Sequence, residues 1–133
     1  MLQRDYIMRI ISMFFEAIRR SWQQAKVDDD PRGAADSLET LIGDATEIDG
    51  SILLSLEPES MASVVQVSGT DPRVTEFIVR SLVLVADYLD AAGDGALADL
   101  RRAQAAALAD AYGIDVPTVE DAVDLEDGPT ASL

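Results

Sequence analysis

Twelve consecutive residues, 28–39, come closest to a known ligand-binding pattern. Their sequence, DDDPRGAADSLE, matches the calcium loop of an EF-hand at the first, third, sixth and twelfth positions. The fifth position normally supplies an oxygen ligand, but here it holds Arg32, which brings a positive charge instead. The fourth position holds Pro31. We therefore expect a solvated acidic loop that caps a helix, and no bound metal.

Other acidic residues occur in pairs that invite comparison with catalytic carboxylates. General acid–base catalysis needs two carboxyl groups in a sheltered pocket, with pKa values that the surroundings separate. Each pair here falls on an expected polar helix face or in a loop, where solvated carboxylates are far more common than catalytic ones. These pairs are Asp44 with Glu47, Glu57 with Glu59, Asp87 with Asp90, and Glu120 with Asp121.

The chain contains neither cysteine nor histidine. The lack of cysteine removes disulfides, thiolate metal sites and thiol nucleophiles. The lack of histidine removes the commonest general base near neutral pH and the commonest transition-metal ligand. We therefore expect a protein that is not an enzyme and that has no catalytic residues, metal or cofactor.

Charge is distributed unevenly along the 133 residues, whose net charge is −15. Residues 1–26 hold five basic and two acidic residues, a net charge of +3, whereas the remaining 107 hold five basic and 23 acidic residues, a net charge of −18. A surface this acidic repels phosphate backbones and anionic lipids. We expect no binding to nucleic acid and none to a membrane surface.

No segment has the features of a leader peptide or a membrane span. The apolar stretch 6–18 is interrupted by Arg9 and Glu16, and no small-residue cleavage site follows it. No uncharged run approaches the roughly 20 residues that cross a bilayer. We expect a cytoplasmic protein.

Apolar residues recur at spacings of three and four, which is typical of amphipathic helices. Aspartate–proline pairs start two of these segments and a glycine, Gly93, ends one. The segment 72–92 is apolar almost all round between 77 and 89, which predicts a central buried helix. The short stretch 51–56 is either one helical turn or a buried connector. The helices expected are about 4–27, 31–48, 58–68, 72–92 and 95–112, of which 60–68 is β-branched enough to be a strand instead.

The last 20 residues, 114–133, contain six acidic residues and no basic one. Their valines allow one or two helical turns, and from Asp127 onward the composition is typical of disorder. Short loops elsewhere imply antiparallel neighbouring helices. We therefore expect an all-α fold, an array of about five helices in residues 1–113, followed by an acidic, partly disordered tail in residues 114–133.

Two segments also show a family resemblance. The opening RDYIMRII, residues 4–11, and the run GAADSLETLIG, residues 33–43, resemble a family of uncharacterised bacterial proteins. In that family a basic amphipathic helix precedes hairpins similar to tetratricopeptide repeats. The resemblance implies helical hairpins, and it implies no mechanism because the family has no assigned activity.

The first helix is the best candidate for a functional surface. It is the only basic element, and its apolar face is broad and aromatic. One interpretation is a docking helix whose contact residues are Arg9, Phe15, Arg19 and Trp22, and which binds another protein or a second copy of the chain. The other is that this helix packs into the domain's own core.

The sequence thus favours an adaptor that uses the first helix and the groove beside it. The alternative function is a small carboxylate-dependent hydrolase or a small-ligand-binding protein. A convergent set of acidic side chains in a deep pocket would favour that alternative, and an exposed apolar strip on the first helix would favour the adaptor.

A calcium titration tests the acidic segment 28–39. We expect the fluorescence of Trp22, which lies shortly before this segment, to stay unchanged at calcium concentrations below about 1 mM, because Arg32 occupies a ligand position. A saturable change at micromolar calcium would contradict this expectation.

Overall fold

The computed structural model describes residues 2–125, and within them the chain forms helices and no strand. The all-α prediction is therefore confirmed, and the ambiguous segment 60–68 is helical up to Val67. No helix among the described residues is long and apolar enough to cross a membrane. The seven helices are α1 (Leu2–Lys26), α2 (Pro31–Thr46), α3 (Gly50–Leu53), α4 (Pro58–Val67), α5 (Pro72–Ala91), α6 (Gly95–Tyr112) and α7 (Val119–Val123).

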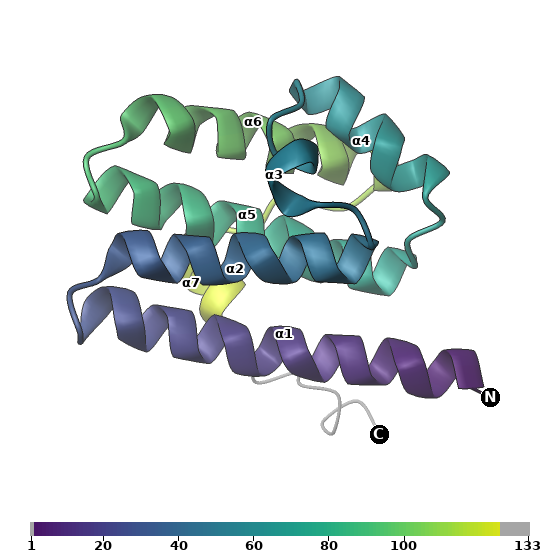
Figure 1. Cartoon of the computed structure of the whole chain (residues 1–133), viewed down its shortest axis with the longest axis horizontal. Coiled ribbons are helices and arrows are strands. Elements are labelled where there is room, and N and C mark those ends of the chain that lie inside the picture. Colours follow the sequence, from purple (N-terminus) through teal and green to yellow (C-terminus); the bar gives the residue numbers. More distant parts are fainter. Residues whose placement is uncertain (1, 126–133) are drawn as a thin grey trace.

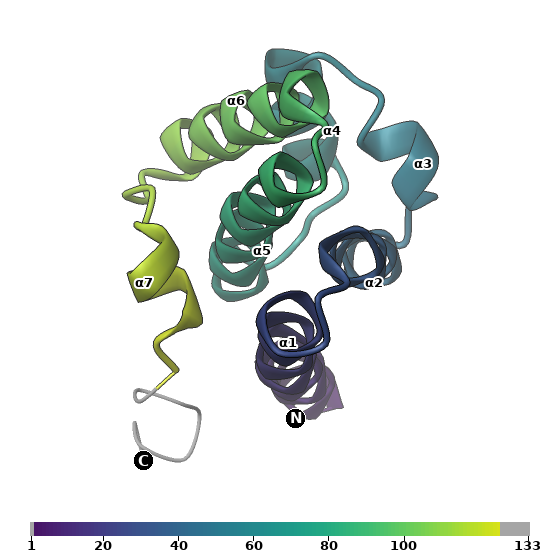
Figure 2. The ribbon, with the colours of Figure 1, turned by 90° about the vertical axis from the view of Figure 1, so that its left-hand side faces the viewer.

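The helices form two antiparallel hairpins that pack on each other. The first hairpin is α1 with α2, the second is α5 with α6, and α2 lies against α5 (Figure 1). The short helix α3 packs on α2, and α4 packs on α6. The last helix, α7, covers α5 and reaches α1 on the side away from α3 (Figure 2). Helix α5 therefore has neighbours on most of its circumference.

Aspartate side chains start the main helices as the sequence indicates. The carboxylates of Asp30 and Asp71 accept hydrogen bonds from backbone amides in the first turns of α2 and α5, and proline follows each of them. Helix α2 ends two residues earlier than predicted. Glu47 adopts a left-handed conformation with φ of 59°, and the amide of Ile48 donates back to the carbonyl of Gly43. This closure ends the helix at Thr46.

The core lies around α5, which confirms that this helix is central and buried. Ile78, Leu82 and Val85 are fully buried. At the α1 side the ring of Phe77 lies 6.1 Å from that of Phe14 and 5.1 Å from that of Phe15, measured between centroids. Such aromatic pairs contribute about 1 kcal/mol each beyond the area they bury.

A buried polar network fastens the connector between α3 and α4 to the rest of the fold. The guanidinium of Arg101 donates to the carboxylate of Glu39 at 2.9 Å and to the carbonyl of Leu54 at 2.8 Å. The side-chain amide of Gln104 donates to the carbonyls of Leu54 and Leu56 at 3.0 and 2.9 Å. Arg101 also donates to the amide oxygen of Gln104 at 3.1 Å. One turn of α6 thus holds both α2 and the connector.

The predicted tail contains a short helix, and the sequence allowed one or two helical turns there. Residues 119–123 form α7, which Thr118 caps, and Ala122 and Leu125 are buried. The carbonyl of Asp124 accepts a hydrogen bond from Arg80 of α5 at 3.1 Å. A few apolar residues thus suffice to anchor this short helix on α5. The predicted disorder from Asp127 onward lies outside the described residues.

Replacement of Gln104 tests the polar network. Gln104→Leu keeps the volume but removes both N–H donors, which leaves the partly buried carbonyl of Leu56 without its partner. We expect a loss of about 2 to 3 kcal/mol in the free energy of unfolding, measured by urea denaturation. The matched variant Gln23→Leu alters an exposed amide on α1 and should change stability by less than about 0.5 kcal/mol. Equal effects of the two variants would contradict the assigned role.

A second buried hydrogen bond makes the free energy of unfolding depend on pH in the alkaline range. The hydroxyl groups of Ser21 and Tyr88 lie 2.9 Å apart and join α1 to α5. Burial raises the pKa of Tyr88 from 10.0 to about 12, against the opposing hydrogen bond from Ser21. The unfolded chain therefore loses this proton at lower pH than the folded one, so the stabilisation is fully present below pH 10 and is lost as pH rises toward 12. We expect a loss of about 1 kcal/mol by pH 11 and about 2 kcal/mol by pH 12.

The variant Tyr88→Phe isolates this contribution from other groups that titrate at alkaline pH. The difference in unfolding free energy between wild type and Tyr88→Phe, measured by denaturation at pH 9, 10 and 11, should narrow as pH rises. A difference that stays constant over this range would show that Tyr88 ionises equally easily in both states.

Candidate functional site

The four predicted contact residues of α1 do not share one surface. Arg9 and Arg19 are exposed, and Trp22 is half-buried. Phe15 is only 8% exposed, because Phe77 of α5 occupies the space beside its ring. Phe15 therefore belongs to the interior of this domain, as the second interpretation of the helix expected.

Trp22 is also engaged by its own chain. The ammonium of Lys26 lies 4.9 Å from the centroid of the indole ring and 3.0 Å from the carboxylate of Asp87 on α5. This cation–π contact and ion pair cover part of the exposed ring. Of the predicted set, the structure leaves the two arginines at the surface.

The basic residues outside α1 have partners. Arg32, Arg73, Arg101 and Arg102 form ion pairs, and Arg80 bonds the carbonyl of Asp124 and lies over the ring of Phe77. On α1, Arg20 pairs with Glu16, and Lys26 pairs with Asp87.

Three arginines of α1 differ from all of these. Arg4, Arg9 and Arg19 form no ion pair with any residue that the structure describes, although Arg19 lies 6.0 Å from the centroid of the Phe15 ring. They are exposed guanidinium groups in a strongly acidic molecule.

The groove beside α1 runs along its contact with α2. It has a volume of about 310 Å³ and contains Met13, Ala17 and Leu41 among serine, threonine, glutamine and charged side chains. Met13 is 44% exposed and is the most exposed apolar side chain of this groove. We use the term outer face of α1 for Arg9, Ser12, Met13 and Arg19.

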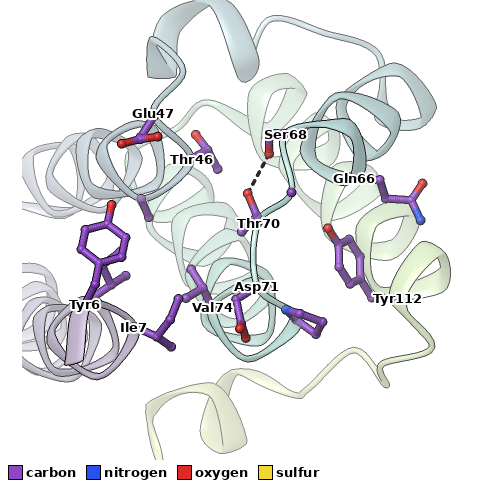
Figure 3. Close-up of a pocket in the computed structure, with 14 residues that line it drawn as sticks. Tyr6, Ile7, Thr46, Glu47, Gln66, Ser68, Thr70, Asp71, Val74 and Tyr112 are labelled. Carbon is purple, nitrogen blue, oxygen red and sulfur yellow. Dashed lines mark hydrogen bonds between the residues drawn. The ribbon is translucent and has the colours of Figure 1, made fainter. Parts of the chain in front are cut away.

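A larger pocket, of about 530 Å³, opens at one end of the bundle (Figure 3). Its walls come from the first turns of α1, the last turns of α2, α4 and α6, and the loop that leads into α5. Tyr6 and Tyr112 stand on opposite sides of it, and Val74 lies between them with Ile7 (Figure 3). The hydroxyl groups of two further lining residues, Ser68 and Thr70, are hydrogen-bonded at 2.8 Å.

Two carboxylates line this pocket and no basic side chain does, among the residues that the structure describes. The carboxylate of Asp71 already has a partner, because it accepts hydrogen bonds from the backbone amide and the guanidinium of Arg73. That contact holds the pKa of Asp71 below its ordinary value. Glu47 forms no ion pair or side-chain hydrogen bond with a described residue. The uncompensated charge among the described lining residues is therefore negative.

Sequence reasoning missed this pocket because no motif spans it. Half of its lining residues come from the contiguous segment 66–74, and the others come from α1, α2 and α6, which are remote in sequence. The last turns of α2, α4 and α6 lack a basic residue, but those of α3, α5 and α7 lack one too, so this feature does not single out the pocket.

The segment that resembles an EF-hand loop is not a loop over most of its length. Asp30 caps α2, and residues 31–39 are helical. The last residue of the pattern, Glu39, is turned toward α6 and pairs with Arg101. No group of three acidic side chains within the described residues is arranged to hold a metal ion.

The pair Asp87 and Asp90 is also divided between separate partners. Asp87 pairs with Lys26 of α1, and Asp90 pairs with Arg102 of α6. Each carboxylate therefore links α5 to a different neighbouring helix, and both ion pairs serve to hold helices together.

Comparison of the chain with family models, curated proteins and solved structures found no match.

Proposed function

We propose that this protein is a non-catalytic adaptor of the cytoplasm, whose outer face of α1 binds an acidic segment of another protein. The observation that carries the proposal is the set of unpaired arginines on α1. Within residues 2–125, which the structure describes, Arg9 and Arg19 form no ion pair, although the chain carries 25 acidic residues. The intramolecular ion pairs elsewhere leave these guanidinium groups available to a carboxylate from outside.

Electrostatics alone gives this surface little affinity. An exposed ion pair contributes about 0.2 to 1 kcal/mol, so two arginines set the orientation and the rate of association more than the binding energy. The apolar contribution comes from Met13, which lies one helical turn from Arg9 and is 44% exposed. An acidic amphipathic segment that covers Met13 and places carboxylates near the arginines fits both features.

The resemblance of the segments 4–11 and 33–43 to a family with tetratricopeptide-like hairpins agrees with this proposal as far as architecture goes. Both segments lie in the hairpin of α1 and α2. The resemblance assigns no partner, so the chemistry of the outer face carries that part of the proposal. A nucleic acid or an anionic membrane is disfavoured as the occupant, because the net charge of −15 repels polyanions of large extent.

Site-specific photo-crosslinking tests the proposal. A crosslinking residue at position 13 should capture a protein in a lysate of the source cells, and the same residue at Ser63, an exposed position of α4, should not. Sequencing of the crosslinked peptide should then show an acidic segment.

Titration calorimetry with the identified segment measures the role of charge. We expect Arg9→Glu to weaken binding about tenfold, because the variant places like charges opposite each other. The matched control is Arg32→Glu, which makes the same charge change at an exposed position of α2. A basic or uncharged partner segment, or equal weakening by both variants, would contradict the proposal. A crosslink between two copies of the chain, with a dimer in light scattering that Arg9→Glu dissociates, would make a second copy the occupant.

A further inference from the structure

We propose that the pocket at the end of the bundle is a binding site for a small organic cation of the primary alkylammonium class. This site is separate from the outer face of α1, and the inference does not depend on the proposed adaptor function. It rests on the volume of the pocket, the helix ends that surround it, and the side chains that line it.

Three helix C-termini converge on the pocket. Helices α2, α4 and α6 each place their last turn in its wall, and each C-terminus carries the equivalent of about half a negative charge. None of these last turns contains a basic residue. The negative ends of the three helix dipoles are therefore not neutralised by their own side chains.

Two helix N-termini oppose this field in part. At the start of α5 the carboxylate of Asp71 is balanced by the guanidinium of Arg73. In the first turn of α1 the charge of Asp5 is balanced by that of Arg4. Each of these ends therefore contributes only its helix dipole, and the three C-termini outnumber them. The carboxylate of Glu47, at the end of α2, adds a full negative charge at the rim. The combined effect favours a cation in the pocket over water or an anion.

The remaining lining residues suit the apolar part of such a ligand. Tyr6 and Tyr112 face the space from opposite sides, and aromatic rings attract ammonium groups (Figure 3). Val74 and Ile7 provide an apolar floor for a methylene chain, while hydroxyl and backbone oxygens accept hydrogen bonds from the N–H groups. The volume of about 530 Å³ lies within the usual range for pockets that bind small molecules.

Two-dimensional NMR with 1,4-diaminobutane as the probe tests the proposal on the full chain. We expect saturable shifts of the backbone amides of Thr46, Glu47, Gly69 and Tyr112, with a dissociation constant of about 1 mM. The uncharged analogue 1,4-butanediol should give no saturable shift. A parallel titration with Nα-acetyl-lysine amide distinguishes a free diamine from a lysine side chain as the source of the ammonium group.

Two matched variants separate specific binding from general attraction to an acidic protein. Glu47→Gln should weaken binding of the diamine about five- to tenfold, because it removes a charge-assisted hydrogen bond. Glu59→Gln makes the same change at the other end of α4 and should weaken it less than about twofold. Tyr6→Leu, at an exposed position, should weaken it about two- to fivefold through the lost ring.

Three results would overturn the proposal. The first is the absence of any chemical-shift change up to about 20 mM diamine, a concentration far above the expected dissociation constant. The second is equal weakening by Glu47→Gln and Glu59→Gln, with shifts spread over the acidic surface. The third is equal binding of butanediol. Circular dichroism of each variant confirms that the fold is retained, so a loss of binding is assigned to the pocket.

Discussion

The arrangement of the second half of the molecule depends on the buried contact of Arg101 and Gln104 with the connector after α3. A buried carbonyl without a hydrogen-bond partner destabilises the fold by about 1 to 3 kcal/mol. Movement of the connector away from these two side chains is therefore unfavourable. The guanidinium is itself buried, at 5% exposure, and its charge is balanced by Glu39 of α2. Three side chains and two backbone carbonyls thus fix one another, and none of them can be removed without taking a hydrogen-bond partner from another.

This contact also determines where α4 lies, and α4 in turn forms one wall of the pocket. The start of α3 can pass so close to α2 only because neither residue at the contact has a side chain: a Cβ atom on Gly43 would lie 2.7 Å from the amide nitrogen of Gly50. After α4, Gly69 turns the chain with φ of 77° into the start of α5. The side chain of Gln66 then joins α4 to the carbonyl of Ala111 at the end of α6. The pocket is therefore a consequence of how the helix ends and the short loop into α5 are held in place.

Local chemistry predicts the elements well and their mutual placement poorly. Asp30 and Asp71 predict the starts of α2 and α5 because capping acts within one turn. The apolar run of α5 predicts that this helix is buried. The interior place of Phe15 could not be inferred, because a broad apolar face fits a partner and a neighbouring helix equally well until Phe77 is located. The packing of α7 could not be inferred for a related reason: Ala122 and Leu125 are few, and their contribution to stability depends on an α5 surface that the sequence does not reveal. The pocket was missed because electrostatics of converging helix ends is a tertiary property.

The two candidate surfaces have opposite electrostatic character, and the net charge bears on each differently. Residues 27–133 carry a net charge of −18, which raises the local concentration of cations. The electrostatic field of the whole molecule therefore attracts a cation toward the pocket. An acidic partner approaches the outer face of α1 against that field. At physiological ionic strength charges are screened beyond about 8 Å, so an anion already in contact with Arg9 or Arg19 feels mainly these arginines. An acidic partner must therefore gain most of its affinity from apolar contact at Met13, and its charges act at close range to exclude basic and uncharged competitors.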